Sequence, residues 1–446
     1  MKQIFQFITS AFALLLCITL NAQTGNAYDM MINGVKVIVK PSGNDIVVIQ
    51  TIIKGGVQNY SEANAGIESL AIRGLTECGT VKDNKNSYKD KLDKVSAQVG
   101  GNTNMDFATF SMNCIKIDFD EVWPLYTAAM LTPRFDSKEF DRIKQDALNG
   151  IRANESNPDF AIVNLSKKTA FGGQKYAMDP QGTIKSVTGL TADQAKMYWK
   201  RIFTKSRMVI VVVADIEKTK IEKVVKELLN NLPMGTPLAV KKQNYKPAAN
   251  SFKAEERENA TNYVLGITGG PQPGTPDYNA FVLAMRIFYN KHFIEIRTKN
   301  GLSYAPATWF STGTNNYSNI YVTTTEPNKY IAVARQLIDK IKSEGFSEDE
   351  LKNEKTGYLT GLYFRDETNS ALAGSLASNE VIHGDWKRTV NINDAMKKVT
   401  VADMNAAFKK YINNITWTYQ GDPKKVNPVM FTQKETPKIP EEKKAF

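Results

Sequence analysis

Histidine is scarce in this sequence. The chain of 446 residues contains only His292 and His383. The two lie far apart, and neither has a second histidine at the short spacing of a metal-binding motif. Because zinc enzymes commonly use two or three imidazole ligands, the sequence offers no histidine-based zinc site.

Cysteine is almost as rare. Of three cysteines, Cys17 lies in an apolar run near the start, which leaves Cys78 and Cys114 for the rest of the chain. These two could pair in an oxidising compartment, although one pair is no disulfide framework for a chain of this length. Burial of both as small apolar residues is an equally good interpretation.

Long hydrophobic runs are missing after the first twenty residues. Residues 11–20 are apolar, follow Lys2, and are too few to span a bilayer. A small residue, Ala22, then precedes Gln23. This pattern predicts a secretory signal peptide over residues 1–22 that is cleaved after Ala22. We therefore expect an exported chain, periplasmic or secreted, with no stable membrane insertion.

Clusters of basic residues are also missing, although the chain is basic overall. Lysine and arginine number 57 against 46 aspartate and glutamate, which gives a formal net charge of +11. These charges are scattered rather than interleaved with aromatic residues, as they would be on a nucleic-acid-binding face. We interpret the excess as solvated surface and expect no nucleic-acid partner.

The chain shows an internal similarity between its halves. In the first half, Thr-Gly-Leu-Thr-Ala-Asp at residues 188–193 is followed by an expected helix and then by Val-Ala-Asp. In the second half, Val-Thr-Val-Ala-Asp at residues 399–403 is followed in the same way by an expected helix and then by Gln-Gly-Asp. This predicts an α+β protein of two duplicated domains, each a mostly antiparallel sheet packed with helices. The expected boundaries are as follows: a domain at 23–232, a proline-containing linker at 233–250, a domain at 251–423 and a polar tail at 424–446.

One segment, residues 288–309, suggests a binding site. We expect a helix up to Ile296 with Arg297 in its last turn, a turn at residues 299–301, and a strand beginning at Leu302. This geometry would point Arg297 and Tyr304 at one spot, where guanidinium and phenol suit a carbonyl oxygen or an oxyanion. Alternatively, Arg297 only complements the helix dipole and Tyr304 only packs.

The first half has its own expected elements. Residues 67–77 predict a helix that stops at Gly79, and residues 88–99 predict a second helix that ends at Gly100-Gly101. The alternation that follows, over residues 104–117, predicts one or two strands.

Five segments follow one another along the chain in a distinctive order: Asn33-Gly-Val-Lys-Val-Ile-Val39, GIESLAIRGLTECGT at residues 66–80, Leu131-Thr-Pro-Arg-Phe135, residues 182–191, and Arg297-Thr-Lys-Asn-Gly-Leu-Ser-Tyr304. In this order they resemble the pitrilysin/insulinase-like metallopeptidase family, whose short members include the mitochondrial processing peptidase subunits. The last segment resembles the family's R-x-x-x-G-L-x-Y. The resemblance covers nearly all of the chain after residue 22 and implies a two-domain clamshell that forms half of a peptidase chamber.

The sequence departs from the family at the zinc motif. Where active members carry H-x-x-E-H, this chain has Ser69, Ile72 and Arg73; shifted by one residue, the positions are Leu70, Arg73 and Gly74. The family's third ligand, a glutamate, is replaced by Gly150. None of these side chains suits zinc, and an arginine repels a cation. We predict no zinc cofactor and no peptidase activity for the chain alone, with zinc only in a partner subunit.

The resemblance also implies a role for what is retained. In two-chain members one subunit brings the zinc helix and the other the Arg–Tyr pair. We therefore predict a catalytically inactive subunit that supplies Arg297, Tyr304 and half of a peptide-binding chamber to an active zinc peptidase with an intact motif. The alternative is a non-enzymatic periplasmic peptide-binding or scaffold protein.

The family holds extended peptides by adding them to a sheet edge in the first half. Residues 101–104 resemble that edge, which makes Asn104 a candidate peptide-binding residue. An ordinary edge strand blunted by polar side chains is the alternative.

Overall fold

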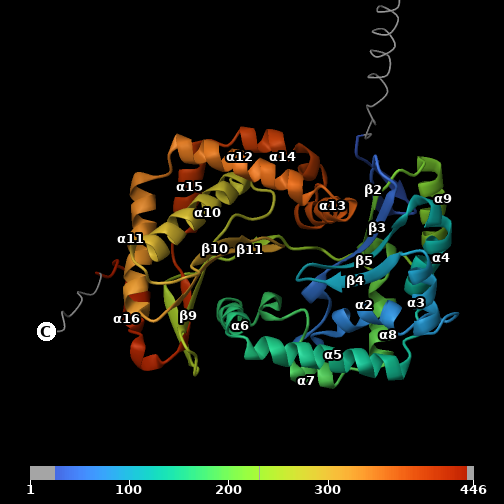
Figure 1. The fold of residues 1–446 in the computed structure, drawn as a ribbon, viewed down its shortest axis with the longest axis horizontal. Coiled ribbons are helices and arrows are strands. Elements are labelled where there is room, and N and C mark those ends of the chain that lie inside the picture. The colour runs from blue at the N-terminus through green and yellow to red at the C-terminus, as the bar shows by residue number, and fades with distance from the viewer. Residues whose placement is uncertain (1–25, 231, 439–446) are drawn as a thin grey trace, which may run out of the picture.

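The structure is a computed structural model that describes residues 26–230 and 232–438. It consists of two β-sheets flanked by helices, one sheet in each half of the chain (Figure 1). The expected signal peptide at 1–22 and the last residues of the expected tail lie outside the described residues. No helix in the described ranges is long and apolar enough to cross a membrane.

The first sheet has the strand order β1-β2-β6-β3-β5-β4, and only β2 and β6 run parallel. The strands are β1 (Tyr28–Ile32), β2 (Val35–Lys40), β6 (Met208–Val213), β3 (Ile46–Lys54), β5 (Phe107–Ile115) and β4 (Gln98–Thr103). β6, with the sequence MVIVVV, is buried along its whole length because helices cover both faces of the sheet at this point.

The second sheet repeats this plan. Its order is β10-β11-β9-β12-β8, with β8 and β12 parallel, and a short strand, β7, pairs with β11. The strands are β10 (Ala307–Ser311), β11 (Asn315–Thr324), β9 (Asn262–Thr268), β12 (Thr416–Gly421), β8 (Ser251–Glu256) and β7 (Gln243–Asn244). When β1 and β7 are left out, the two sheets have the same order from β2 and from β8, and each has one parallel pair at that end; β7 adds a short parallel pairing with β11. The predicted α+β fold with duplicated, mostly antiparallel sheets is confirmed.

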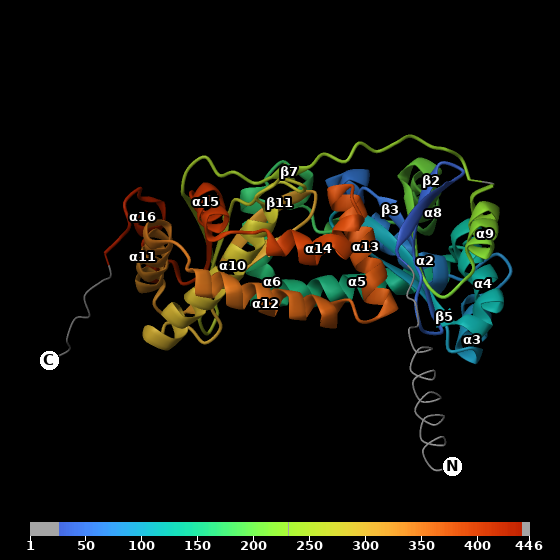
Figure 2. The same ribbon diagram turned by 90° about the horizontal axis from the view of Figure 1, so that it is seen from above.

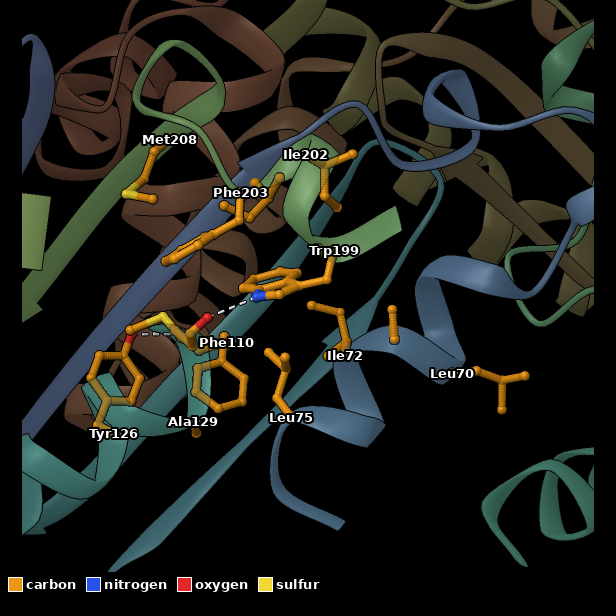
Figure 3. Close-up of a cluster of buried hydrophobic side chains, with 14 of the residues drawn as sticks. Leu70, Ile72, Leu75, Phe110, Tyr126, Ala129, Trp199, Ile202, Phe203 and Met208 are labelled. Atoms are coloured by element: carbon orange, nitrogen blue, oxygen red, sulfur yellow. Dashed lines mark hydrogen bonds between the residues drawn. The ribbon is translucent and has the colours of Figure 1, made fainter. Parts of the chain in front are cut away.

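The helices of the first half pack mainly on one face of the first sheet. They are α2 (Ile67–Glu77), α3 (Lys85–Lys94), α4 (Phe119–Leu131), α5 (Ser137–Ser156), α6 (Pro158–Ala170), α7 (Ile184–Thr188), α8 (Ala192–Ile202) and α9 (Lys218–Asn230). Figure 3 shows the core they form, where Leu75 of α2 and Trp199 of α8 approach Phe110 of β5. The indole Nε1 of Trp199 donates a hydrogen bond to the carbonyl of Met130 at 2.8 Å.

The second half contains seven further α-helices within the described residues. They are α10 (Tyr278–Phe293), α11 (Pro327–Glu344), α12 (Glu348–Arg365), α13 (Asn369–His383), α14 (Lys387–Lys397), α15 (Val401–Tyr411) and α16 (Pro428–Thr432). The segment between α9 and β8 runs along one face of the molecule with little regular structure besides β7 (Figure 2). Cys78 and Cys114 are both buried and free, which decides between the two interpretations of this pair.

Each half places one helix on the sheet of the other half. α13 packs on one face of the first sheet, opposite the face that carries the main core of the first half. On this face Leu376 is buried together with Ile52 and Val211. In return, α6 packs against β9 and β12, and Ser166 of α6 is hydrogen-bonded to Thr418 of β12. The two halves are thus joined through their hydrophobic cores.

Candidate functional site

The zinc-motif positions lie on α2, beside the edge strand β4. Ser69 is half-buried, and Ile72 is completely buried. A Cβ atom at Gly101 of β4 would lie only 2.5 Å from Cγ2 of Ile72, so this side chain is packed directly under the strand. A hydrocarbon therefore fills the place at which the family resemblance puts the catalytic glutamate.

Arg73, at the position of the second histidine in one alignment and of the glutamate in the other, belongs to a network of ion pairs. Its Nε donates to Glu77 at 2.9 Å, and Arg142 of α5 donates to the other oxygen of Glu77 at 2.8 Å. Arg142 also donates to Glu139 and to Asp146, each at 2.9 Å. Burial opposes ionisation of Glu77, but the hydrogen bonds from Arg73 and Arg142 outweigh it and lower the pKa of Glu77. Charged side chains therefore link α2 to α5.

These residues do not fit a zinc ion. The nearby carboxylates are engaged by guanidinium groups, and Gly150 of α5 has open space where a ligating side chain would begin. Within residues 26–230 and 232–438, no three His, Cys, Asp or Glu side chains are grouped closely enough to hold a metal ion. That the purified chain carries no zinc stays a prediction.

We expect Glu77→Gln to lower the free energy of unfolding by about 1 kcal/mol, because it removes the negative charge that Arg73 and Arg142 share. The side chains of Arg73 and Glu77 are 31% and 32% exposed, so salt should screen part of this effect. Urea unfolding at low and high salt measures the loss. Asp93→Asn, which breaks the exposed pair with Lys89, is the control and should change little. An equal loss for both variants would contradict a special role for the network.

Glu68 is a buried carboxyl group on the first turn of α2 that the sequence analysis did not single out. It is 1% exposed and accepts hydrogen bonds from the hydroxyl of Tyr198 and from Nδ2 of Asn59, the latter at 3.0 Å. Its other oxygen, Oε1, has no hydrogen-bond partner within the described part of the chain. Burial raises the pKa of Glu68 from 4.5 to about 7. The only sign of this buried carboxyl group in the sequence is a glutamate in a helix among apolar residues.

This pKa shift makes the stability depend on pH. Because the pKa of Glu68 is higher in the folded than in the unfolded chain, its contribution is fully present below about pH 4.5 and is lost as the pH rises through about 7. We expect the loss to reach about 3 kcal/mol by pH 8. Glu68→Gln cannot ionise and should remove this part of the slope when urea unfolding is compared at pH 5 and pH 8. An unchanged slope would contradict the assignment.

The segment that carries Arg297 ends differently from the prediction. α10 continues into a π-helical turn at Ile294–Lys299, and Gly301 then turns the chain with a φ of 60°. Leu302 is buried and its N–H donates back to the carbonyl of Ile296. The prediction of a strand from Leu302 is wrong, because β10 begins only at Ala307. Pro306, which lacks an N–H group, lies directly before this start.

Arg297 and Tyr304 do lie together, with the guanidinium on the face of the ring. Cζ of Arg297 is 4.0 Å from the ring centroid of Tyr304, and Nη1 donates to the Tyr304 carbonyl at 3.1 Å. Phe293 lies 5.1 Å from the same guanidinium. Tyr304 is 79% exposed. Two rings therefore orient a guanidinium that still has N–H groups to offer.

The pair and α2 belong to different halves of the molecule. Figure 1 shows α10 among the helices of the second half and α2 among those of the first, and the view in Figure 2 agrees. Arg297 and the residues of the zinc motif therefore come from different parts of the fold.

Asn104 lies in the turn after the edge strand rather than in it. Its Oδ1 accepts hydrogen bonds from the N–H groups of Asp106 at 2.8 Å and Phe107 at 3.0 Å. A role for Asn104 in peptide binding stays a prediction. The predicted helix over residues 88–99 is wrong at its end: α3 stops at Lys94, Ser96 has a φ of 50°, and residues 98–103 form β4. The pair Gly100-Gly101 lies inside this strand.

Comparison with known proteins gives one family. Residues 189–358 match the family model described as the peptidase M16 inactive domain. A protein of Helicobacter pylori named non-peptidase homolog YmxG is 20% identical over 92% of this chain and 98% of its own length. An uncharacterized zinc protease of Streptomyces coelicolor is 18% identical over 72% of each chain.

Solved structures share the fold. The peptidase M16 inactive domain from Pseudomonas fluorescens has a TM-score of 0.80 at 19% identity and covers 91% of this chain and 100% of its own. The periplasmic protease PqqL from Escherichia coli has a TM-score of 0.75 at 14% identity, over 90% of this chain and 47% of that one. Together with the motifs, the family model over residues 189–358 and the relatives confirm the resemblance to the pitrilysin-like peptidase M16 family, and this chain lacks the family's H-x-x-E-H motif.

Proposed function

We propose that this protein is an exported, non-catalytic subunit that pairs with an M16 subunit carrying an intact H-x-x-E-H motif. It contributes Arg297, Tyr304 and half of a peptide-binding chamber. The observation that carries the proposal is the contrast between the zinc-motif residues on α2 and the Arg297–Tyr304 pair. Arg73, which falls within the zinc motif in both alignments, forms an ion pair with Glu77, whereas Arg297 lies on the ring of the exposed Tyr304.

The exposed pair fits a role toward a bound peptide. A guanidinium held by aromatic rings loses little freedom when it binds a carbonyl oxygen or an oxyanion, and such preorganised donors stabilise charge that develops in hydrolysis. Zinc chemistry, which the chain cannot host at α2, would be supplied by the partner.

The sheet edge fits an extended peptide. β4 is the last strand of the first sheet, and a Cβ atom at Gly100 would meet nothing within 4 Å. Free backbone groups at such an edge can pair with an added strand. β4 packs beside α2, so a peptide added there would lie along the helix that carries the zinc motif in active members.

Export rests on the pattern of residues 1–22, and the structurally similar PqqL is described as a periplasmic protease. Mass spectrometry of the chain recovered from the periplasm and the medium would identify the cleavage site.

Reconstitution tests the proposed function. The mature chain, an M16 homologue with H-x-x-E-H from the same genome, and their mixture are assayed with quenched peptides, and zinc is measured in each. We expect the two proteins to co-purify, zinc to be found only with the partner, and peptidase activity to be greatest in the mixture. A chain that carries stoichiometric zinc and digests peptides alone would overturn the proposal.

A second candidate is a peptide-binding or scaffold protein without any peptidase partner. It is favoured by the likeness to YmxG, which is named a non-peptidase homolog and is matched over nearly its full length. This candidate predicts peptide binding or a stable complex that contains no active M16 subunit, and a partner peptidase whose rate is unaffected by the chain.

A further inference from the structure

A cavity of about 590 Å³ lies in the second half, and neither Arg297 nor Tyr304 is among the residues that line it. It is enclosed by α10, α12, α13, α14 and the strand β10. Figures 1 and 2 show α12 and α14 side by side, with α13 at one end and α10 beneath them. This volume is in the range of pockets that hold small ligands or a single large side chain.

Aromatic rings supply much of the lining. They are Tyr278 and Tyr289 of α10, Trp309 and Phe310 of β10, and Tyr358 of α12. Tyr278 and Phe310 meet edge to face with their centroids 5.6 Å apart. Another aromatic ring would find edges and faces to pack against in this surrounding.

The charges in the lining leave one cation without a counter-ion. Arg286 forms an ion pair with Glu354, and Arg365 is bound to Asp366 by two hydrogen bonds of 2.9 and 3.0 Å. Arg388 instead donates to the neutral amide oxygen of Asn279 at 3.1 Å, and no carboxylate of the described ranges forms an ion pair with it. One guanidinium is therefore available for one negative charge.

Two polar groups of the lining also lack partners. Thr308 is 5% exposed, and its hydroxyl has no hydrogen-bond partner among the described residues. Nδ1 of His383 also has no hydrogen-bond partner among these residues. Burial, aided by the charges of Arg388 and Lys242, lowers the pKa of His383 to about 3. The imidazole is thus neutral near pH 7 and can donate or accept a hydrogen bond. Buried polar groups without partners are costly, and a ligand would satisfy them.

We propose that this cavity binds a carboxylate joined to an aromatic side chain, with the carboxylate on Arg388 and the ring among Tyr278, Phe310 and Tyr358. A single uncompensated guanidinium suits a monoanion, and Arg–carboxylate pairing is strong and directional. Two sources share this chemistry: a free N-acylated aromatic amino acid, and the C-terminal residue of a peptide. The inference does not depend on the proposed function, because it concerns the isolated chain and different residues.

The two histidines make binding measurable. His383 lines the cavity, whereas His292 is completely buried elsewhere, so their ring signals in NMR provide a probe and an internal control. The full mature chain is titrated with N-acetylphenylalanine, with its amide, and with a peptide ending in a free phenylalanine carboxylate. We expect the His383 signal to shift with at least one of the acids and not with the amide. A shift with the peptide alone assigns the ligand to peptide ends, and a shift with the small acid alone assigns it to free acids.

Variants test the assigned contacts. We expect Arg388→Gln to weaken binding roughly 10- to 100-fold. Thr308→Val, which keeps the shape of the side chain, should weaken it about 5-fold. Arg365→Gln is the matched control, because Asp366 already neutralises this arginine, and should leave affinity close to that of the wild type. An unperturbed His383 with both acids at millimolar concentration, or equal binding of acid and amide, would overturn the proposal.

Discussion

Arg297→Ala should reduce kcat/KM of the reconstituted two-subunit peptidase about 100-fold. The guanidinium is held by Phe293 and Tyr304 and needs little rearrangement to meet a polarised carbonyl oxygen. Its loss removes a preorganised donor from the site. Because this contribution is largest when negative charge develops, kcat should fall more than KM rises.

Two variants sharpen this test. Tyr304→Phe keeps the ring on which Arg297 stacks and removes only the hydroxyl, and we expect a loss of about 10-fold. Lys299→Ala is the control, since Lys299 lies two residues from Arg297 but pairs with Glu295 at 2.8 Å; it should retain the full rate. If Arg297→Ala also retained the full rate, Arg297 would be only a charge at a helix end and the scaffold function would be favoured.

Leu376→Ala should lower the free energy of unfolding by about 3 kcal/mol. Leu376 of α13 is completely buried against the first sheet, although it belongs to the second half of the sequence. The substitution leaves a cavity at the point where the two halves share a core. The ion pair between Lys36 of β2 and Glu380 of α13, at 2.6 Å, limits how far the helix can move to fill it.

Gly374→Ala, in the same helix, is the matched control. A Cβ atom at this position would meet nothing within 4 Å, so alanine should stabilise the helix by about 0.5–1 kcal/mol. Urea unfolding followed by fluorescence gives both values. A loss below about 1 kcal/mol for Leu376→Ala would show that α13 is not docked on the first sheet, because an exposed leucine costs little to remove.

Some features of the site could be read from local patterns. The helix at residues 67–77 was predicted with the bounds of α2, because its apolar spacing and the glycine after it are both local signals. The contact between Arg297 and Tyr304 followed from a short turn. The strand predicted from Leu302 and the helix predicted to Val99 failed because Pro306 and the positive φ of Ser96 mark boundaries that periodicity alone does not show.

Other features depend on residues that are distant in sequence. From the sequence, the one interpretation of Arg73 was that its charge would repel zinc. The ion-pair network could not be predicted, because Arg142, which also binds Glu77, lies some seventy residues further along the chain. Glu68 acquires its raised pKa from burial against α8, and the cavity around Arg388 is assembled from four helices and a strand. α14, which forms one of its walls, was not predicted.

The sequence by itself determined the fold class, the duplication, the missing zinc ligands and the family, because these depend on residue identity, order and short-range periodicity. Only the tertiary structure decided that each half packs a helix on the other half's sheet, that Arg73 and Arg142 share the carboxylate of Glu77, and that Arg388 lines a cavity without a carboxylate partner among the described residues. The physical reason is that burial and charge pairing depend on which distant side chains come within a few ångströms, and this is set by how the chain packs.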